Sequence, residues 1–422
     1  MRMKRSFFFV ILIFCLPISI FADTGLSLKG YYKNFFLVLA PPKIEQSEIA
    51  ASLQQPMIGL VNNRLRLNLF YTPNSRFSAN VTYDISPRIQ DPSLFRQQLF
   101  FAVINPYAYR FDDLDSRLYP VQNTAVGSFA IFQNLDRAML TIHTKPADIF
   151  IGRQAIAWGS ARIVNPTDVV APFPFEELDT EDRIGVDAIR LRIPNGFMGE
   201  FDTGYICGKD FKLANSAYYL RNKLYIWQAD VSFLLLGFRQ NMLAGLDIAR
   251  SMGGAGFWLE TAYVFVAAFD HYTAFKKYNY LRLSTGMDYS FGGKTYGFIE
   301  YHFNGAGAAT ARDYLNEFLT PAYTEGTVYL MGKHYLTPGL TYQITPLISF
   351  TGQSLLNLTD PSIFFSPQVE YNVAENIYVS GGAFFGIGKK PKLLNAVGSI
   401  SMFCSEFGTY PNVYFTSFRI YF

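Results

Sequence analysis

The chain has few charged residues and few cysteines. Only 16% of its 422 residues are charged, whereas a soluble domain usually has about a quarter. Three cysteines cannot build a disulfide framework, and the four histidines, His143, His271, His302 and His334, are too scattered to bind one metal together. With 50% hydrophobic residues, a disordered or collagen-like chain is excluded, and the composition argues against an ordinary cytosolic enzyme.

Long apolar runs are also missing after residue 22. The best candidates are 231–238, which is too short to span a bilayer as a helix, and 256–269, which is interrupted by Glu260. No nucleophile-elbow pattern and no phosphate-loop spacing is present either. We therefore predict no membrane helix, no enzymatic activity and no cofactor, and we assign no catalytic, cofactor-binding or metal-binding residue.

Residues 1–22 have the pattern of an export signal. Arg2, Lys4 and Arg5 precede the 15-residue apolar run 7–21 and the small residue Ala22. Because a membrane anchor needs roughly 20 apolar residues, we predict a signal peptide that is cleaved to leave residues 23–422. Its removal leaves 33 basic against 33 acidic residues, and a neutral chain gives no reason to expect a nucleic-acid partner.

Aromatic residues and strict alternation are abundant. In 75–86, apolar side chains occupy every second position and polar ones lie between them. The same period of two recurs in 59–71, 217–227 and 294–304, with the charges on one side. An exported apolar chain without membrane helices satisfies its backbone in lipid only as a closed barrel. We therefore predict an all-β fold, a transmembrane antiparallel up-and-down β-barrel.

The end of the chain points to the outer membrane. Its last alternate positions are Tyr414, Thr416, Phe418, Ile420 and the terminal Phe422. This pattern resembles the C-terminal signal of bacterial outer-membrane barrels, which their assembly machinery reads. The resemblance implies contact with outer-membrane lipids and with that machinery, and it makes Phe418, Ile420 and Phe422 the assembly signal. The alternative is a terminal strand of a secreted sandwich.

The spacing of turn signals predicts 18 strands. Eight tight turns lie at 72–74, 145–146, 194–196, 228–229, 251–254, 292–293, 345–346 and 374–375. Nine longer, external connections alternate with them, at 40–58, 87–132, 158–182, 208–216, 269–277, 305–329 and 389–411 and near Gln240 and Asp360. Both ends of such a barrel lie in the periplasm, so the strand number is even. Sixteen is the alternative number, and 397–403 could be a strand or a loop.

A barrel of this size leaves an aqueous channel. Connection 87–132 is the longest, and we expect it either to fold inward as a constriction or to cap the barrel. The predicted pore-lining residues are Lys29, Lys33, Arg64, Arg66, Arg137, Arg190, Arg192, Arg221, Lys223, Glu260, Asp288, Glu300 and Glu370. One wall is thus basic and the other acidic. These charges either set a field across the pore or neutralise each other between neighbouring strands.

One stretch resembles a known family. It comprises 151–159 (IGRQAIAWG), 165–168 (NPTD) and 185–187 (GVD). The succession is similar to porin-like outer-membrane barrels of Gram-negative-type bacteria that carry a GRQ…WG…NPTD segment. Since that family is poorly characterised, the resemblance implies location and architecture rather than substrate. Arg153 would either touch solute or pin a loop through Asp168 or Asp187, and we favour pinning.

Together these patterns predict a porin-like outer-membrane channel for passive diffusion of small polar solutes. One alternative is a loop-plugged barrel that acts as a surface adhesin or structural protein. Another is a carrier of hydrophobic ligands, for which the inward faces are rather too charged. The sequence leaves open whether the protein is a homo-oligomer and whether Cys207 and Cys404 form a disulfide.

Overall fold

The computed structural model describes residues 25–43, 57–95, 107–269, 278–325, 328–393 and 400–422. The predicted signal peptide lies outside them. In this described part, no helix is long and apolar enough to cross a membrane.

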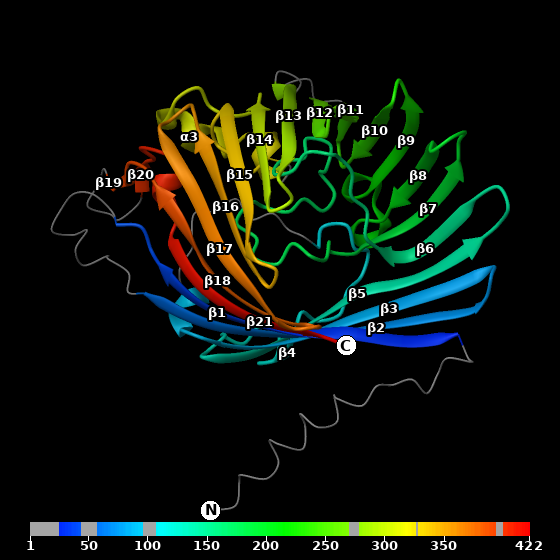
Figure 1. The fold of residues 1–422 in the computed structure, drawn as a ribbon, viewed down its shortest axis with the longest axis horizontal. Helices are drawn as coiled ribbons and strands as arrows, with labels where there is room; N and C mark the ends of the chain where they lie inside the picture. The colour runs from blue at the N-terminus through cyan, green and yellow to red at the C-terminus, as the bar shows by residue number, and fades with distance from the viewer. Residues whose placement is uncertain (1–24, 44–56, 96–106, 270–277, 326–327, 394–399) are drawn as a thin grey trace, which may run out of the picture.

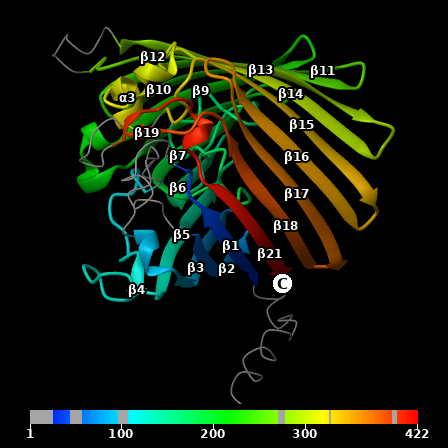
Figure 2. The same cartoon turned by 90° about the vertical axis from the view of Figure 1, so that its left-hand side faces the viewer.

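Eighteen strands form one closed barrel (Figure 1). They are β1 (Leu26–Ala40), β2 (Ile58–Asn74), β3 (Phe77–Gln90), β5 (Phe129–His143), β6 (Asp148–Gln154), β7 (Val186–Pro194), β8 (Glu200–Ile206), β9 (Ala217–Ile226), β10 (Ala229–Phe238), β11 (Asn241–Met252), β12 (Ala255–Phe265), β13 (Tyr280–Phe291), β14 (Thr295–Asn304), β15 (His334–Thr345), β16 (Ile348–Asn357), β17 (Ser362–Ala374), β18 (Ile377–Ile387) and β21 (Asn412–Tyr421). Each strand pairs antiparallel with the next, and β21 pairs with both β18 and β1 (Figure 2). The predicted fold class and the strand number of 18 are confirmed.

Turns and longer connections alternate as predicted. All eight tight turns join strands at one end of the barrel, from the turn between β2 and β3 to the turn between β17 and β18. We call this the turn end, and the opposite end, with the nine other connections, the loop end. Tight turns were predictable because Gly, Pro and Asn reverse a chain locally, without help from distant residues.

The remaining short elements lie in the loop-end connections. Strand β4 (Arg117–Tyr119) pairs with the part of β5 that extends past β6. Helices α3 (Tyr314–Glu317) and α4 (Pro321–Thr324) lie between β14 and β15. Strands β19 (Lys392–Leu393) and β20 (Ile400–Met402) pair with each other between β18 and β21. The segment 397–403 therefore contains a short strand, but that strand is not part of the barrel.

Side chains alternate between the two faces of the wall. On β1, the alternate residues Tyr31, Lys33, Phe35 and Leu37 are buried in the interior. Large apolar side chains are exposed on the outer surface, among them Leu69, Val81, Leu140, Ile151, Ile189 and Leu220. An apolar outer band is the surface that a bilayer covers.

A bulge adds charge to the interior between β3 and β5. The register shifts between Thr82 and Tyr83, so Asp136 is an extra residue on β5. A bulge re-aims side chains locally. Here Asp136 and its neighbour Arg137 form an ion pair with each other, in which Nη1 of Arg137 lies 2.7 Å from Oδ2 of Asp136.

The chain ends close the barrel through Gly30. The backbone N–H of Gly30 donates to the Phe422 oxygen at 2.8 Å, and the Phe422 N–H donates to the Gly30 oxygen at 2.9 Å. A Cβ on Gly30 would lie 2.8 Å from Cζ of the Phe422 ring and 2.4 Å from the Arg66 carbonyl oxygen. Glycine is therefore needed where the last ring lies over the first strand.

We expect Phe422→Ser to weaken closure of the barrel by about 1–2 kcal/mol, because apolar contact over Gly30 is lost. Gly30→Val should weaken closure too, since its side chain has no room. Heat-modifiability on gels measures the folded fraction. The control is Tyr414→Ser, which changes an aromatic residue on the same face at the other end of β21. Equal folded fractions in all variants would contradict a specific role of Phe422.

Candidate functional site

One connection crosses the interior of the barrel. Residues 155–185, which join β6 to β7 and which we call the strap, run from one wall to the other inside the ring of strands (Figure 1). Because the strap lies away from bulk water for much of its length, its backbone and its charges need partners on the walls.

Two buried glutamates of the acidic wall bind the first half of the strap. Glu300 on β14 accepts the backbone N–H groups of Arg162, Ile163 and Val164 at 2.6, 3.2 and 3.1 Å. Glu260 on β12 accepts the N–H and the hydroxyl of Thr167 at 2.8 and 2.7 Å. Both carboxylates are 0–1% exposed. The strap backbone thus solvates the two charges, and the charges satisfy its N–H groups.

Neighbouring strands extend this contact. The Ser160 hydroxyl donates to Asp247 on β11, and the Arg162 guanidinium pairs with Asp288 on β13 at 2.7 Å. On β13, the Ser284 hydroxyl donates to the carbonyl oxygen of Val164 at 2.6 Å. Strands β11 to β14 therefore all hold the same stretch of the strap.

The basic wall binds the second half of the strap through side chains. Lys33 on β1, which is 0% exposed, pairs with Asp179 at 2.8 Å and with Glu181 at 2.5 Å. On β2, Arg64 pairs with Asp179 at 3.2 Å and Arg66 with Asp182 at 3.4 Å. The strap brings acids to the side of the barrel where the wall has an excess of bases.

The two halves of the strap are tied to each other. Arg183 pairs with Asp168 and also donates to the carbonyl oxygen of Ala171 at 2.6 Å. Burial raises the pKa of Asp168, although the Arg183 guanidinium acts in the opposite direction. The strap therefore forms a closed loop across the lumen.

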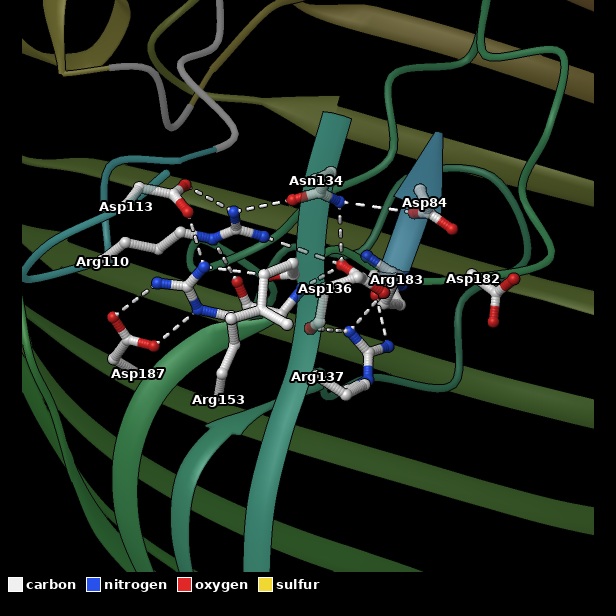
Figure 3. Close-up of polar contacts among 12 residues, drawn as sticks. Asp84, Arg110, Asp113, Asn134, Asp136, Arg137, Arg153, Asp182, Arg183 and Asp187 are labelled. Atoms are coloured by element: carbon white, nitrogen blue, oxygen red, sulfur yellow. Dashed lines mark hydrogen bonds and ion pairs between the residues drawn. The ribbon is translucent and has the colours of Figure 1, made fainter. Parts of the chain in front are cut away.

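A cluster of charges joins the strap to β2, β3 and β5 (Figure 3). Asp136 lies at its centre. It accepts from Arg66 at 2.6 Å and from the N–H of Gly185, at the end of the strap, at 3.0 Å. Arg66 also pairs with Asp84 on β3 at 3.0 Å. Each buried charge in this cluster has an opposite charge beside it, as burial requires.

Arg153 connects a second connection to the same cluster (Figure 3). Its guanidinium pairs with Asp187 on β7 and with Asp113 of connection 87–132, both at 2.7 Å. It also donates to the carbonyl oxygens of Leu135 and Asp112 at 2.9 and 2.7 Å. Arg153 therefore contacts Asp187, one of its two predicted partners. Asp168, the other, contacts Arg183 instead.

Connection 87–132 contributes a short stretch to the interior. Tyr109 is buried, and Arg110 donates to the carbonyl oxygen of Gly185 at 2.9 Å. Partial burial acts to raise the pKa of Asp113, but the guanidinium groups of Arg110 and Arg153 outweigh it and hold the pKa below its ordinary value. Residues 96–106 of this connection lie outside the described part, and a constriction or a cap formed by it stays a prediction.

The other predicted pore-lining residues lie on interior positions of the register, mostly in pairs between strands. Arg190 pairs with Asp202 at 2.6 Å, and Arg419 pairs with Glu370. Arg192 and Arg221 contact Glu200, Lys223 contacts Asp230 at 3.2 Å, and Lys29 is exposed near the turn end. These contacts correspond to the second of the two charge interpretations, neutralisation between neighbouring strands.

Two cavities flank the strap. One, of about 550 Å³, lies between the strap and β2, β3 and β5, with Arg64 and Arg88 in its lining. The other, of about 350 Å³, lies between the strap and β16 to β18. Phe173, Pro174 and Glu177 of the strap border both. The strap therefore separates two polar spaces of the lumen.

Among the described residues, no group of three His, Cys, Asp or Glu is arranged to hold a metal ion. Cys207 and Cys404 are both free thiols, so they do not form the disulfide that the sequence left open.

No protein-family model matches the chain, and no curated protein matches its sequence. Solved structures do match. OccAB2 of Acinetobacter baumannii has a TM-score of 0.54 and 7% identity, over 94% of this chain and 98% of that one. OccD3 (OpdP) of Pseudomonas aeruginosa has a TM-score of 0.51 and 9% identity, over 94% and 91%. The fold is that of the Occ outer-membrane porins. OccK1 (OpdK) of P. aeruginosa, at 0.51 and 7%, agrees.

Removing the Glu300 carboxylate should release the strap from the acidic wall. We expect Glu300→Ala to lower the free energy of unfolding by about 2–4 kcal/mol, because three N–H groups lose their acceptor. Glu300→Gln keeps one acceptor oxygen and should cost less. The control is Glu370→Ala. Because its partner Arg419 lies on the barrel wall and not on the strap, this change should leave the strap resistant to proteolysis. Urea unfolding in micelles and limited proteolysis of 155–185 measure both effects. Equal cleavage of the strap in all three variants would contradict the tether.

Proposed function

We propose that this protein is a porin-like channel of the bacterial outer membrane, through which small polar solutes diffuse passively around the strap. The observation that carries this is the pair of polar cavities on either side of the strap, inside a barrel of a size that leaves a lumen. A third cavity, of about 830 Å³, lies beside 159–162 at the turn end.

The shared fold of the Occ porins supports the location and the kind of transport. In this proposal the predicted pore-lining residues that keep exposed surface, among them Lys29, Arg192 and Lys223, face the solute path. Lys33, Arg66, Glu260 and Glu300 are buried and hold the strap instead, and Arg153 pins connection 87–132 through Asp113. Phe418, Ile420 and Phe422 are read by the assembly machinery after the signal peptide directs export. No enzymatic step and no cofactor is included.

A plugged barrel is the second candidate, and a specific observation favours it. The loop end contains a large buried apolar cluster, in which strap residues Ile156, Trp158, Val169 and Val170 pack with β7 to β13 and with Tyr323. Such packing fills part of the lumen. A barrel closed in this way would act at the cell surface as an adhesin or a structural protein.

Single-channel conductance in a planar bilayer separates the two functions. The mature chain, 23–422, is compared with a variant in which 171–180 is replaced by a short Gly-Ser linker. We expect discrete steps from the intact protein and larger steps from the variant. Conductance from the variant alone would support the plugged barrel, and silence from both would overturn the channel. A third protein, shortened within 117–128, tests whether connection 87–132 narrows the lumen instead.

The basic side chains in the lining of the 550 Å³ cavity are Arg64 and Arg88, and they offset the acids Asp84, Glu177, Asp179 and Asp182. Neutralising both, as Arg64→Gln with Arg88→Gln, is expected to raise the ratio of K⁺ to Cl⁻ permeability at least about twofold, since even a single unit charge about 8 Å from an ion in water contributes about 0.5 kcal/mol. Reversal potentials in a KCl gradient measure the ratio. Arg76→Gln, the same change at an exposed position in the turn between β2 and β3 and outside the lining of the three cavities, is the matched control. An unchanged ratio would place both arginines outside the conduction path.

A further inference from the structure

The middle of the strap is held by aromatic rings rather than by charges. Phe175 lies in a cage of four rings, which we call the aromatic cage: Phe364 at 4.8 Å, Tyr410 at 5.5 Å, Phe407 at 5.7 Å and Tyr329 at 6.1 Å between centroids. Phe364 belongs to β17, and the other three belong to loop-end connections. The cage thus joins the strap to the external side of the barrel.

A carboxyl group borders this cage without a partner. Glu176 follows Phe175, and its Oε2 is buried and accepts no hydrogen bond from any described residue. The titratable groups that face it are Glu177 on the strap and the Tyr329 and Tyr410 hydroxyls from the connections. Burial raises the pKa of Glu176 to about 7, and the neighbouring Glu177 adds to the shift.

A second carboxyl group lies on the other side of the cage. Glu406, directly before Phe407, is 0% exposed. It accepts the N–H of Met331 at 2.9 Å, the Tyr335 hydroxyl at 2.5 Å and the Asn357 amide at 2.6 Å. All three donors are neutral. Burial raises the pKa of Glu406 to about 8.

The other titratable groups around Glu406 are acids and phenols. Asp360, from the connection between β16 and β17, accepts the Glu406 N–H at 2.7 Å and also accepts from Tyr314 of α3. Tyr323 of α4 and Tyr410 face it as well. Burial raises the pKa of Asp360 too. Ionisation of Glu406 would therefore place a charge beside Asp360, with neutral donors as its described contacts.

We propose that the uncharged forms of Glu176 and Glu406 keep the aromatic cage closed around Phe175, so that the strap is clamped in the lumen in acidic and neutral medium and released in alkaline medium. The device uses two carboxyl groups on opposite sides of one set of rings. Its conductance readout rests on the proposed function, whereas the clamping itself does not.

The sign follows from proton binding. Each carboxyl has a higher pKa in the clamped state than when exposed, so the clamped state binds more protons. Clamping is complete below the ordinary carboxyl pKa and is lost as pH rises through about 7 for Glu176 and about 8 for Glu406. Between the ordinary carboxyl pKa and those values, each group shifts the equilibrium toward release by about tenfold per pH unit, and above them the shift levels off.

Hydrogen exchange of the full protein in detergent micelles, read by mass spectrometry between pH 5 and pH 9, tests the clamp. After correction for the intrinsic pH dependence of exchange, amides of 172–178 should lose protection by at least about tenfold per unit between pH 5 and pH 7, and the loss should level off above about pH 8. Amides of 179–183, which ion pairs with Lys33, Arg64 and Arg66 hold, should change much less. Uniform behaviour of the two stretches would overturn the proposal.

Variants separate the clamp from general alkaline loosening. Glu176→Gln and Glu406→Gln each remove one titrating group and should each lose less protection in 172–178 at pH 9 than the parent chain, and the double variant should keep this stretch protected. Phe175→Ala should lose protection already at pH 6, which keeps the test decisive if Glu406→Gln folds poorly. Glu375→Gln, the same change at an exposed turn-end position, is the control and should behave as the parent chain. Unchanged pH profiles in both Gln variants would falsify the proposal.

Bilayer recordings add a readout that depends on the channel. Released strap segments should raise current noise as pH rises from 5 to 8 in the parent chain, and less so in Glu176→Gln. A silent bilayer together with pH-dependent exchange would reject the channel and retain the clamp. Steady conductance together with pH-independent exchange would retain the channel and reject the clamp.

Discussion

A segment that crosses the inside of a barrel needs a partner for every N–H group and every charge that it removes from water. The strap meets this requirement in three different ways. On the acidic wall its backbone binds carboxylates of the barrel, as at Glu300. On the basic wall its own carboxylates bind the barrel, as Asp179 binds Lys33. Between the walls Phe175 packs on rings. Each half of the strap thus fits only one side of the lumen.

This arrangement explains how a nearly neutral chain has strongly charged walls. The bases of β1 and β2 exceed the acids of those strands, and Asp179, Glu181 and Asp182 of the strap supply the difference. On the opposite wall Arg162 of the strap pairs with Asp288, but Glu260 and Glu300 are compensated by peptide dipoles of the strap. Because N–H groups carry only partial charge, the two glutamates depend on several of them at once. The strap therefore supplies counter-charges or hydrogen-bond donors to both walls.

The sequence predicted the barrel because its signals are local. A period of two in 75–86 and the turn residues at 72–74 describe β3 and the turn before it without reference to any other strand. The predicted interior charges followed from the same parity. The strap was not predicted, since its partners are distant: Val164 and Glu300 are 136 residues apart. The acids at 176–182 were visible, but a single sequence does not say which wall they meet.

Arg153 shows where motif reasoning ends. Its pairing with Asp187 is between register neighbours on β6 and β7, so adjacent strands sufficed to suggest it. Its contact with Asp113 joins two connections and needed the fold. Gly152, the residue before Arg153, has a positive φ of 111°, which glycine adopts without strain. A Cβ at this position would also lie 2.2 Å from the Ala138 carbonyl oxygen, so only glycine fits here. One glycine thus sets the end of β6 where Arg153 meets both connections, and loss of that backbone geometry would separate the strap's start from the cluster at Asp136.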